Sequence, residues 1–432
     1  MADHDQALTP AGPTMRARAA DWYGDTRLAE LVDTVRSRPD TLGTFLVVLV
    51  ATAIYLFTAS RDRQNLDYFV RLADAFLHGR IYLTEAPSWL NELIPKDGVW
   101  YVAYPPFPAV LLIPFVLVFG PDFPPQVASC IYGGVGVGLA WLVFGRFALS
   151  ERVRLGLTIA FGFGTVLWYV AEVGSVWYFS HVVAVMMSMA ALLLVLERRW
   201  PFLVGLFLGC AAISRLPVGL TAPFFLAFIV GLGWPPRLPP PETRRAALRD
   251  GLAFLVGIGI PTLAYLAYNY ARWGTIVDQS YVLIPGVLED PVYAAHGILS
   301  LEYIPRHIYA IFLRSWNFVD EPPFFEPSWW GLSLFMTTPL FLWLFKGRLR
   351  DPRVAWAWIA TLLALVPIVT HGNVGFTQFG YRFSLDVQPL LFVILATVFE
   401  RGMGRWAWLA TAASVAFVAY GIWTIGIGFV EF

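Results

Sequence analysis

Long apolar runs recur along the chain from residue 42 onward, and shorter polar segments separate them. A helix needs about 20 consecutive apolar residues to cross a membrane. Ten stretches meet or approach that length, near 42–59, 126–146, 154–171, 178–196, 202–233, 251–271, 329–345, 354–370, 386–400 and 406–428. Soluble folding does not explain so many runs, so the pattern predicts an all-α polytopic membrane protein.

The block 202–233 is too long for one membrane-spanning helix. It is interrupted at Ser214-Arg215-Leu216-Pro217. Proline breaks the helical hydrogen-bond ladder, and an arginine beside it is costly inside an apolar helix. We therefore predict a hairpin of two short helices here, which brings the expected number of spans to about eleven, within a range of ten to twelve.

The segment 107–119 is apolar but short, and prolines and Gly120 bound it. Its length suits a surface or re-entrant helix better than a span. If it does not cross, 20 of the 30 Lys and Arg residues fall on the side of the N-terminus. The positive-inside rule then predicts a cytoplasmic tail, 1–41, and a single transmembrane domain, 42–432, with large outer loops at 60–125 and 272–328.

Composition narrows the function classes. The chain is 58% hydrophobic and 14% charged, with a net charge of zero, against about 25% charged residues in soluble domains. Without a basic patch, nothing indicates a nucleic-acid partner. Cys130 and Cys210 both fall in predicted spans, so no disulfide framework is expected.

The outer loop 60–125 has an ordered pattern. Residues 66–77 place apolar side chains at helical spacing, and Trp89, Trp100, Tyr101 and Tyr104 follow. Aromatic residues of these types anchor at the headgroup level of a bilayer. We expect a surface helix that lies on the membrane and covers the bundle, which is the geometry of a site that a lipid can reach.

Five segments, in this order, resemble the GT-C superfamily of membrane glycosyltransferases. They are NLDYFVRLADAFLHGRIYL, YPPFPAVLLIPFVLVFG, GLFLGCAAISRLPVGLTAPFF, NYARWGTIVDQSY and FGYRFSLDVQPLLF. The resemblance, to bacterial members in its later segments, covers residues 42–400 and identifies no subfamily. It implies a GT-C-like bundle in the plasma (inner) membrane, with an active site on the extracytoplasmic face. It also implies a polyprenyl-phosphate sugar as donor, with the acceptor unknown.

The chemistry of such a transfer limits the candidate residues. Phosphate is a good leaving group, so a base for the acceptor hydroxyl and cations near the phosphate suffice for a single inverting displacement. Asp67 occupies the position of the acidic residue that the resemblance implies, while Asp62 and Glu172 are the other candidates. Arg215, inside an apolar block, and Arg382, just before a span, are candidates for holding the phosphate.

Arg306, His307 and His181 complete the candidate binding residues. Arg306 and His307 lie in a stretch of loop 272–328 that is expected to form a second surface helix, and His181 stands among aromatic residues. Asp67, Glu172, His181 and His371 include ligand types for a divalent metal ion, but no spacing such as HExxH supports a site. The sequence therefore identifies no cofactor and leaves a metal ion open.

Two other functions remain open at this point. A transporter or flippase for a lipid-linked solute would place charges near the middle of the membrane. A non-catalytic scaffold that keeps the fold would leave Asp67 facing lipid or bulk water. The depth of the buried charges and the exposure of Asp67 distinguish these functions from an enzyme.

Overall fold

The computed structural model describes residues 39–59, 66–322 and 324–426. The predicted tail 1–41 lies almost wholly outside these residues. The chain divides into two units, which meet between Leu46 and Val47, inside the first described helix. Residues 39–46 of the first unit form the start of that helix. Everything below concerns the second unit.

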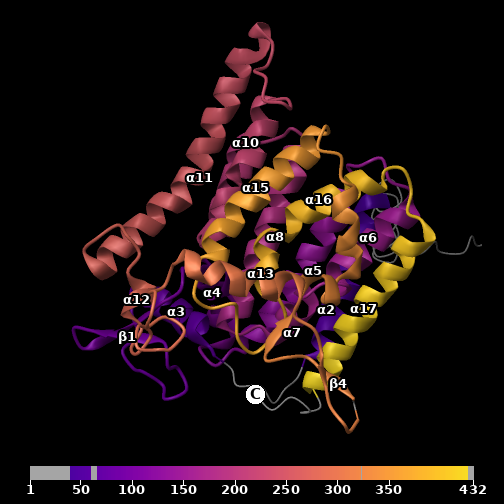
Figure 1. The fold of residues 1–432 in the computed structure, drawn as a ribbon. Helices are drawn as coiled ribbons and strands as arrows, with labels where there is room; N and C mark the ends of the chain where they lie inside the picture. Colours follow the sequence, from indigo (N-terminus) through magenta and orange to yellow (C-terminus); the bar gives the residue numbers. More distant parts are fainter. Residues whose placement is uncertain (1–38, 60–65, 323, 427–432) are drawn as a thin grey trace, which may run out of the picture. The chain divides into compact units, whose positions relative to one another are not determined.

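Helices dominate the described chain (Figure 1). The longer ones are α2 (Pro39–Thr58), α3 (Tyr68–Leu77), α4 (Phe107–Phe119), α5 (Pro125–Phe144), α6 (Glu151–Phe163), α7 (Leu167–Val173), α8 (Val176–Leu196), α9 (Pro201–Ala212), α10 (Ala222–Val230), α11 (Arg244–Trp273), α13 (Ile304–Phe312), α15 (Pro352–Val369), α16 (Gln388–Phe399) and α17 (Arg405–Gly426). Short helical turns are η1 (Leu216–Thr221), η2 (Pro241–Thr243), α12 (Ser280–Leu283), η3 (Leu301–Tyr303), α14 (Leu334–Thr337), η4 (Pro339–Lys346) and η5 (Arg382–Asp386).

Strands are few and short. β1 (Leu93–Lys96) pairs antiparallel with β2 (Val99–Val102), and β3 (Asn317–Phe318) pairs with β4 (Phe325–Glu326). β5 (Trp330–Leu332) pairs in parallel with β6 (Gln378–Gly380), with Leu332 opposite Gly380. This last pair joins two distant segments and holds the backbone just before η5.

Six described helices are long and apolar enough to cross a membrane, judged by length and composition, or seven if α6 and α7 form one bent span. α4, α9, η1 with α10, and α16 are shorter apolar helices. The predicted polytopic helical fold is confirmed, whereas the number of eleven spans stays a prediction. The break at 214–217 is present, because α9 ends at Ala212 and η1 begins at Leu216.

The prediction for 329–345 is wrong in detail. Instead of one regular helix, this stretch contains β5, α14 and the 3₁₀ turns of η4. Gly331 has a φ of +81°, and Pro339 opens η4. A positive φ and a proline both interrupt an α-helix, so the apolar residues are present but the backbone turns repeatedly.

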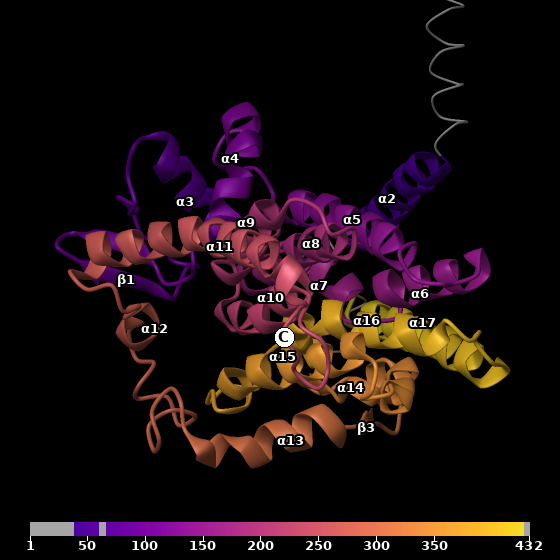
Figure 2. The ribbon, with the colours of Figure 1, turned by 90° about the horizontal axis from the view of Figure 1, so that it is seen from above.

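Both predicted surface helices are present. α3 buries Tyr68, Phe69 and Leu72 against α4. α13 buries His307 and Ala310 and packs beside α15, as Figure 2 shows. Amphipathic helices of this kind are stable when one face is covered and the other meets solvent or lipid headgroups.

The most extensive helix pair is α9 with α11, which lie side by side in Figure 2. A Cβ atom added at Gly205 would overlap the carbonyl oxygen of Phe254, and one at Gly257 would overlap that of Phe202. Small residues let helix backbones approach in membrane proteins. The two glycines therefore set the spacing of the pair.

We expect Gly257→Leu to lower the thermal unfolding midpoint of the purified protein, because overpacking costs about 1–3 kcal/mol or more. Gly259→Leu is the matched control, since a Cβ at Gly259 meets nothing within 4 Å. Differential scanning fluorimetry in detergent compares the two. Equal midpoints for both variants would show that the α9–α11 contact does not limit stability.

Candidate active site

Arg382 is the buried cation of the candidate site. It follows β6 and is 6% exposed. Its Nη1 donates to the carbonyl oxygen of Phe376 at 2.8 Å, and the guanidinium lies over the rings of Tyr178 and Phe383, 5.1 and 5.4 Å from their centroids. No described carboxylate is within ion-pair distance of it. Burial lowers the pKa of Arg382, but arginine stays charged in proteins.

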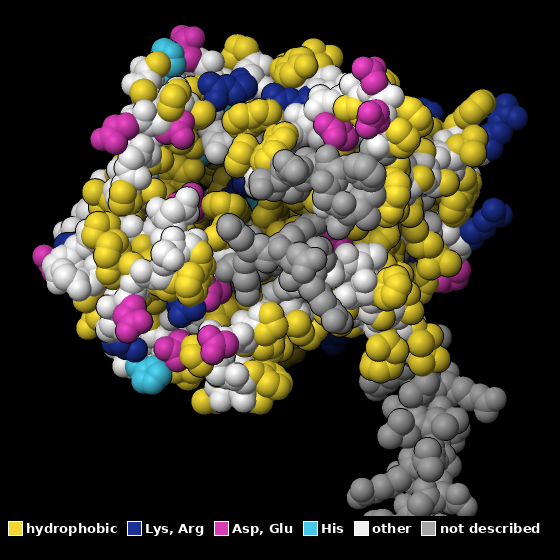
Figure 3. Space-filling model, turned by 90° about the horizontal axis from the view of Figure 1, so that it is seen from below, with side chains coloured by type: hydrophobic (Ala, Val, Ile, Leu, Met, Phe, Trp, Pro, Cys, Tyr) yellow, Lys and Arg dark blue, Asp and Glu magenta, His cyan; other side chains and the backbone are white. Residues whose placement is uncertain are grey.

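A buried charge without a carboxylate partner is costly unless an anion binds it. The Nε of Arg382 is also buried without a hydrogen-bond partner among the described residues. The face seen in Figure 3 is hollowed near its centre, and basic and histidine side chains are visible in the hollow. The arrangement around Arg382 is therefore suited to an anionic ligand.

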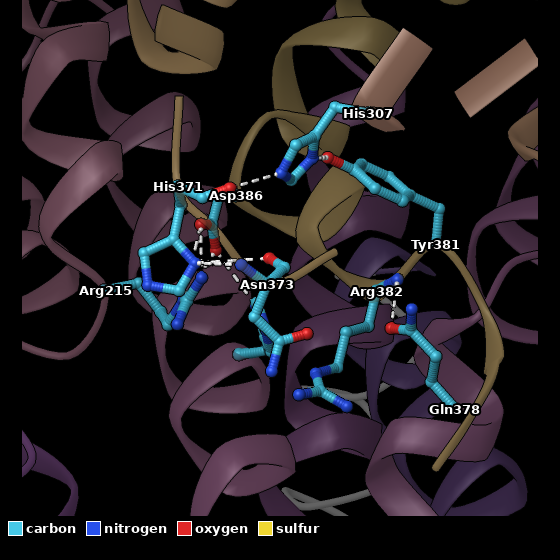
Figure 4. Close-up of polar contacts among 9 residues, drawn as sticks. Arg215, His307, His371, Asn373, Gln378, Tyr381, Arg382 and Asp386 are labelled. Carbon is cyan, nitrogen blue, oxygen red and sulfur yellow. Dashed lines mark hydrogen bonds and ion pairs between the residues drawn. The ribbon is translucent and has the colours of Figure 1, made fainter. Parts of the chain in front are cut away.

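Asp386 connects the second arginine to a histidine. Arg215 donates from Nε and Nη2 to the two carboxylate oxygens, at 3.1 and 3.0 Å. The Nδ1 of His181 lies 2.9 Å from Oδ1 of the same carboxylate. The carboxylate is fully buried, whereas the side chain of Arg215 is 23% exposed. This triad ties η5 to α8 and to the break after α9, and Figure 4 shows Arg215 beside Asp386.

The four-residue spacing in the sequence also allows an ion pair between Arg382 and Asp386, and the structure does not form it. The turn η5 is a 3₁₀ helix, in which residues four apart do not share a face as they do in an α-helix. Asp386 points to Arg215 and His181, while Arg382 points away from them. Asp386 thus neutralises Arg215. Arg382 has no ion pair among the described residues and is able to bind an anionic ligand.

Asp386→Asn should lower protein stability by about 3–5 kcal/mol, because it leaves Arg215 partly buried and unpaired. Asp122→Asn is the control, since Asp122 is exposed. Thermal unfolding followed by circular dichroism measures the difference. If the Asp386 variant unfolds at the same temperature as the control, the triad is not a structural support.

Asp67 lies at the start of α3, where the sequence places it. It is the N-cap residue, but its side chain does not cap the helix. Instead Oδ1 accepts from Nε1 of Trp89 at 3.1 Å, and Oδ2 pairs with Arg71 at 2.9 Å. Asp67 is 8% exposed. The carboxylate is therefore held in one orientation at the edge of the buried cluster rather than in bulk water.

Glu92 is an acidic residue of the site that the sequence analysis missed. Its Oε2 accepts from Nε1 of Trp177 at 3.2 Å, and it interacts electrostatically with Arg382. Burial raises its pKa to about 7, although the Trp177 hydrogen bond and Arg382 both act to lower it. The feature of the sequence that could have indicated Glu92 is its place as an acidic residue among apolar neighbours, Leu90, Leu93 and Ile94. No motif marks it.

A pKa raised on folding makes the stability depend on pH. The contribution of Glu92 is fully present below the unfolded pKa, near 4.5, and is lost as pH rises through about 7. We therefore expect Glu92→Gln to gain stability relative to wild type between pH 4.5 and 7. Unfolding midpoints of both proteins across this range test it. If the difference in unfolding midpoint between wild type and Glu92→Gln does not change with pH, the raised pKa of Glu92 is contradicted.

The remaining predicted acids lie elsewhere. Glu172 is on α7 and fully buried, so a substrate cannot reach its carboxylate in this conformation. Asp62 lies outside the described residues. Asp74, on α3, is paired with His78 at 3.6 Å and is partly exposed. Of the described acids, Glu92 interacts with Arg382, while Asp67 is the one predicted acid whose carboxylate is held in place without being fully buried.

The second surface helix is attached by His307 and Arg306. His307 Nδ1 lies 2.7 Å from the hydroxyl of Tyr381, and Nε2 lies 2.8 Å from the carbonyl oxygen of His371. Arg306 donates to the carbonyl of Gly372 at 2.7 Å. Burial lowers the pKa of His307 to about 4. Both residues hold the segment before Arg382 in place, so they act on the site through the backbone (Figure 4).

The predicted metal ligands do not form one group. Within the described part of the chain, no cluster of three or more His, Cys, Asp or Glu side chains is arranged to hold a metal ion. His181 is bound to Asp386, and His371 accepts from the backbone nitrogen of Asn373 at 3.1 Å. These histidines have structural partners.

Comparison with known proteins identifies the fold of the chain through solved structures and not through sequence. No family model matches the chain, and no curated protein matches it in sequence. Two crystal structures of ArnT from Cupriavidus metallidurans match with TM-scores of 0.54, bound to undecaprenyl phosphate, and 0.53, in the apo state. Both are 14% identical, and the matches cover 91% and 92% of this chain but only 66% of ArnT, just under two thirds.

A third match is the protein O-mannosyltransferase Pmt1-Pmt2 complex of S. cerevisiae, solved with its sugar donor. It is 16% identical, covers 62% of this chain and 36% of that one, and has a TM-score of 0.37. The agreement with ArnT extends over nearly the whole chain. The chain therefore shares the polytopic helical fold of ArnT.

Proposed function

We propose that the protein is a membrane glycosyltransferase that moves a sugar from a polyprenyl-phosphate donor to an acceptor. The observation that carries the proposal is Arg382, a buried arginine among aromatic rings with no described carboxylate partner. Arginine recognises phosphate by charge and by paired hydrogen bonds. The similarity to ArnT, whose structure contains undecaprenyl phosphate, supports the same class of ligand.

In the proposed reaction, Arg382 stabilises the phosphate as negative charge develops on it. Asp67 takes the proton of the acceptor hydroxyl, whose oxygen attacks the anomeric carbon as the bond to phosphate breaks. This is one displacement, so the configuration at that carbon inverts. Arg215 contributes less than the sequence suggests, because Asp386 already neutralises it.

The positions of the charged residues favour an enzyme over a transporter. Arg215 follows the end of α9, Asp386 precedes α16, and His181 lies near the start of α8. A transporter site near the middle of the membrane would place such residues at mid-helix. The burial of Asp67 likewise argues against a scaffold. With the orientation that the Lys and Arg distribution predicts, we propose an active site at the extracytoplasmic face of the inner membrane and a cytoplasmic N-terminus.

Asp67→Asn should lower sugar transfer by about 10²-fold or more, the usual range for loss of a general base. Asp74→Asn, on the same helix, is the matched control and should keep activity. The assay measures transfer from a panel of radiolabelled polyprenyl-phosphate sugars into membrane extracts. Transfer that survives Asp67→Asn would exclude Asp67 as the base and favour Glu92.

Arg382→Gln should weaken binding of undecaprenyl phosphate by about 30-fold or more, since loss of a buried charged partner costs about 2–5 kcal/mol. Arg80→Gln removes one positive charge from the same loop region as α3 and serves as the control. Microscale thermophoresis in detergent measures both affinities. Equal affinities for the two variants would show that the phosphate binds elsewhere.

A further inference from the structure

A cavity lies between the ends of four helices, and Arg382 is not among the residues that line it. Its volume is about 410 Å³, within the range of small-molecule sites. Val195 of α8, Val204 of α9 and Phe228 of α10 form apolar walls, and Ala247 of α11 lies on the opposite side. The cavity has room for a ligand with both a polar and an apolar part.

Basic side chains stand at the mouth of this cavity. Arg198 and Arg199, in the turn between α8 and α9, line it and are exposed. Arg198 has no ion-pair partner among the described residues. Arg199 reaches Glu197 only at 4.0 Å, and Glu197 is already bound by Arg146 at 2.5 Å. The one acid in the lining, Asp250, is paired with Arg249 at 2.9 Å. The free charge at the mouth is therefore positive.

The cavity and the Arg382 site are at opposite ends of the same helices. α9 begins at the cavity with Pro201 and ends beside Arg215. α11 begins there with Arg244 and ends at Trp273, near β1. A 30-residue helix is about 45 Å long, enough to cross a bilayer. Figure 1 shows α10 and the start of α11 together, far from β1 and α12.

We propose that this cavity binds the headgroup of an anionic phospholipid, with one acyl chain along its apolar wall. Arg198 and Arg199 would contact the phosphate, as basic pockets between membrane helices do. The apolar path for the acyl chain is the lining of the cavity itself, which Val195, Val204, Phe228, Ile229 and Val230 form. A soluble anion would use the arginines but not this apolar path, so a lipid fits better. The proposal is independent of the catalytic one.

The test is native mass spectrometry of the detergent-purified protein with three probes. They are phosphatidylglycerol, phosphatidylcholine with the same acyl chains, and glycerol 3-phosphate as the soluble headgroup. We compare wild type with R198Q/R199Q and with Ala247→Trp, which fills the cavity without changing charge. R348Q/R350Q is the control, because it removes two exposed arginines at another connection. Circular dichroism confirms that each variant is folded.

The proposal expects one retained phosphatidylglycerol on wild type and on the control. Retention should fall about tenfold or more in both R198Q/R199Q and Ala247→Trp. Equal retention of phosphatidylcholine would overturn it, since charge would then not matter. So would an equal loss in the control, unchanged retention in Ala247→Trp, or equally strong binding of glycerol 3-phosphate, which would indicate a site for a soluble anion.

Discussion

The structure depends on one buried carboxylate, that of Asp386, which forms an ion pair with Arg215 and not with Arg382. Asp386 binds Arg215 through both oxygens and also meets His181, so three separate elements are fixed by one charged group. Such a group is stable in an apolar surrounding only when its hydrogen bonds are satisfied. The same arrangement leaves Arg382, four residues earlier, without an ion pair to any carboxylate in the described part of the chain. A site for an anion and the support of that site therefore come from one short turn.

The surroundings of Arg382 come from parts of the chain that are far apart in sequence. β5 and β6 hold the backbone before it, α8 supplies Tyr178, and α13 fixes the preceding segment through His307. Glu92 approaches from the first outer loop. α9 and α11 pack closely, and a basic cavity lies at the ends where both helices begin. The bundle thus carries a buried arginine near one end of these helices and exposed arginines at a cavity near the other end.

Apolar periodicity and length predicted the helical class, both surface helices and the break at Arg215, because these depend on local sequence. They did not predict the irregular path of 329–345, where Gly331 and Pro339 interrupt an apolar run. Resemblance singled out Asp67 and Arg382, and their roles stay predictions. It could not show that Asp386 prefers Arg215 or that Glu92 faces Arg382, because both contacts join residues more than 80 positions apart.

The central claim is that Arg382 is the cation that receives a lipid phosphate. The most direct measurement is an electron cryomicroscopy structure of the protein in a nanodisc with undecaprenyl phosphate. The account predicts density for the phosphate in contact with the Arg382 guanidinium, with the ion pair between Arg215 and Asp386 intact. Density for the phosphate at another site, with Arg382 bound only to protein groups, would contradict it.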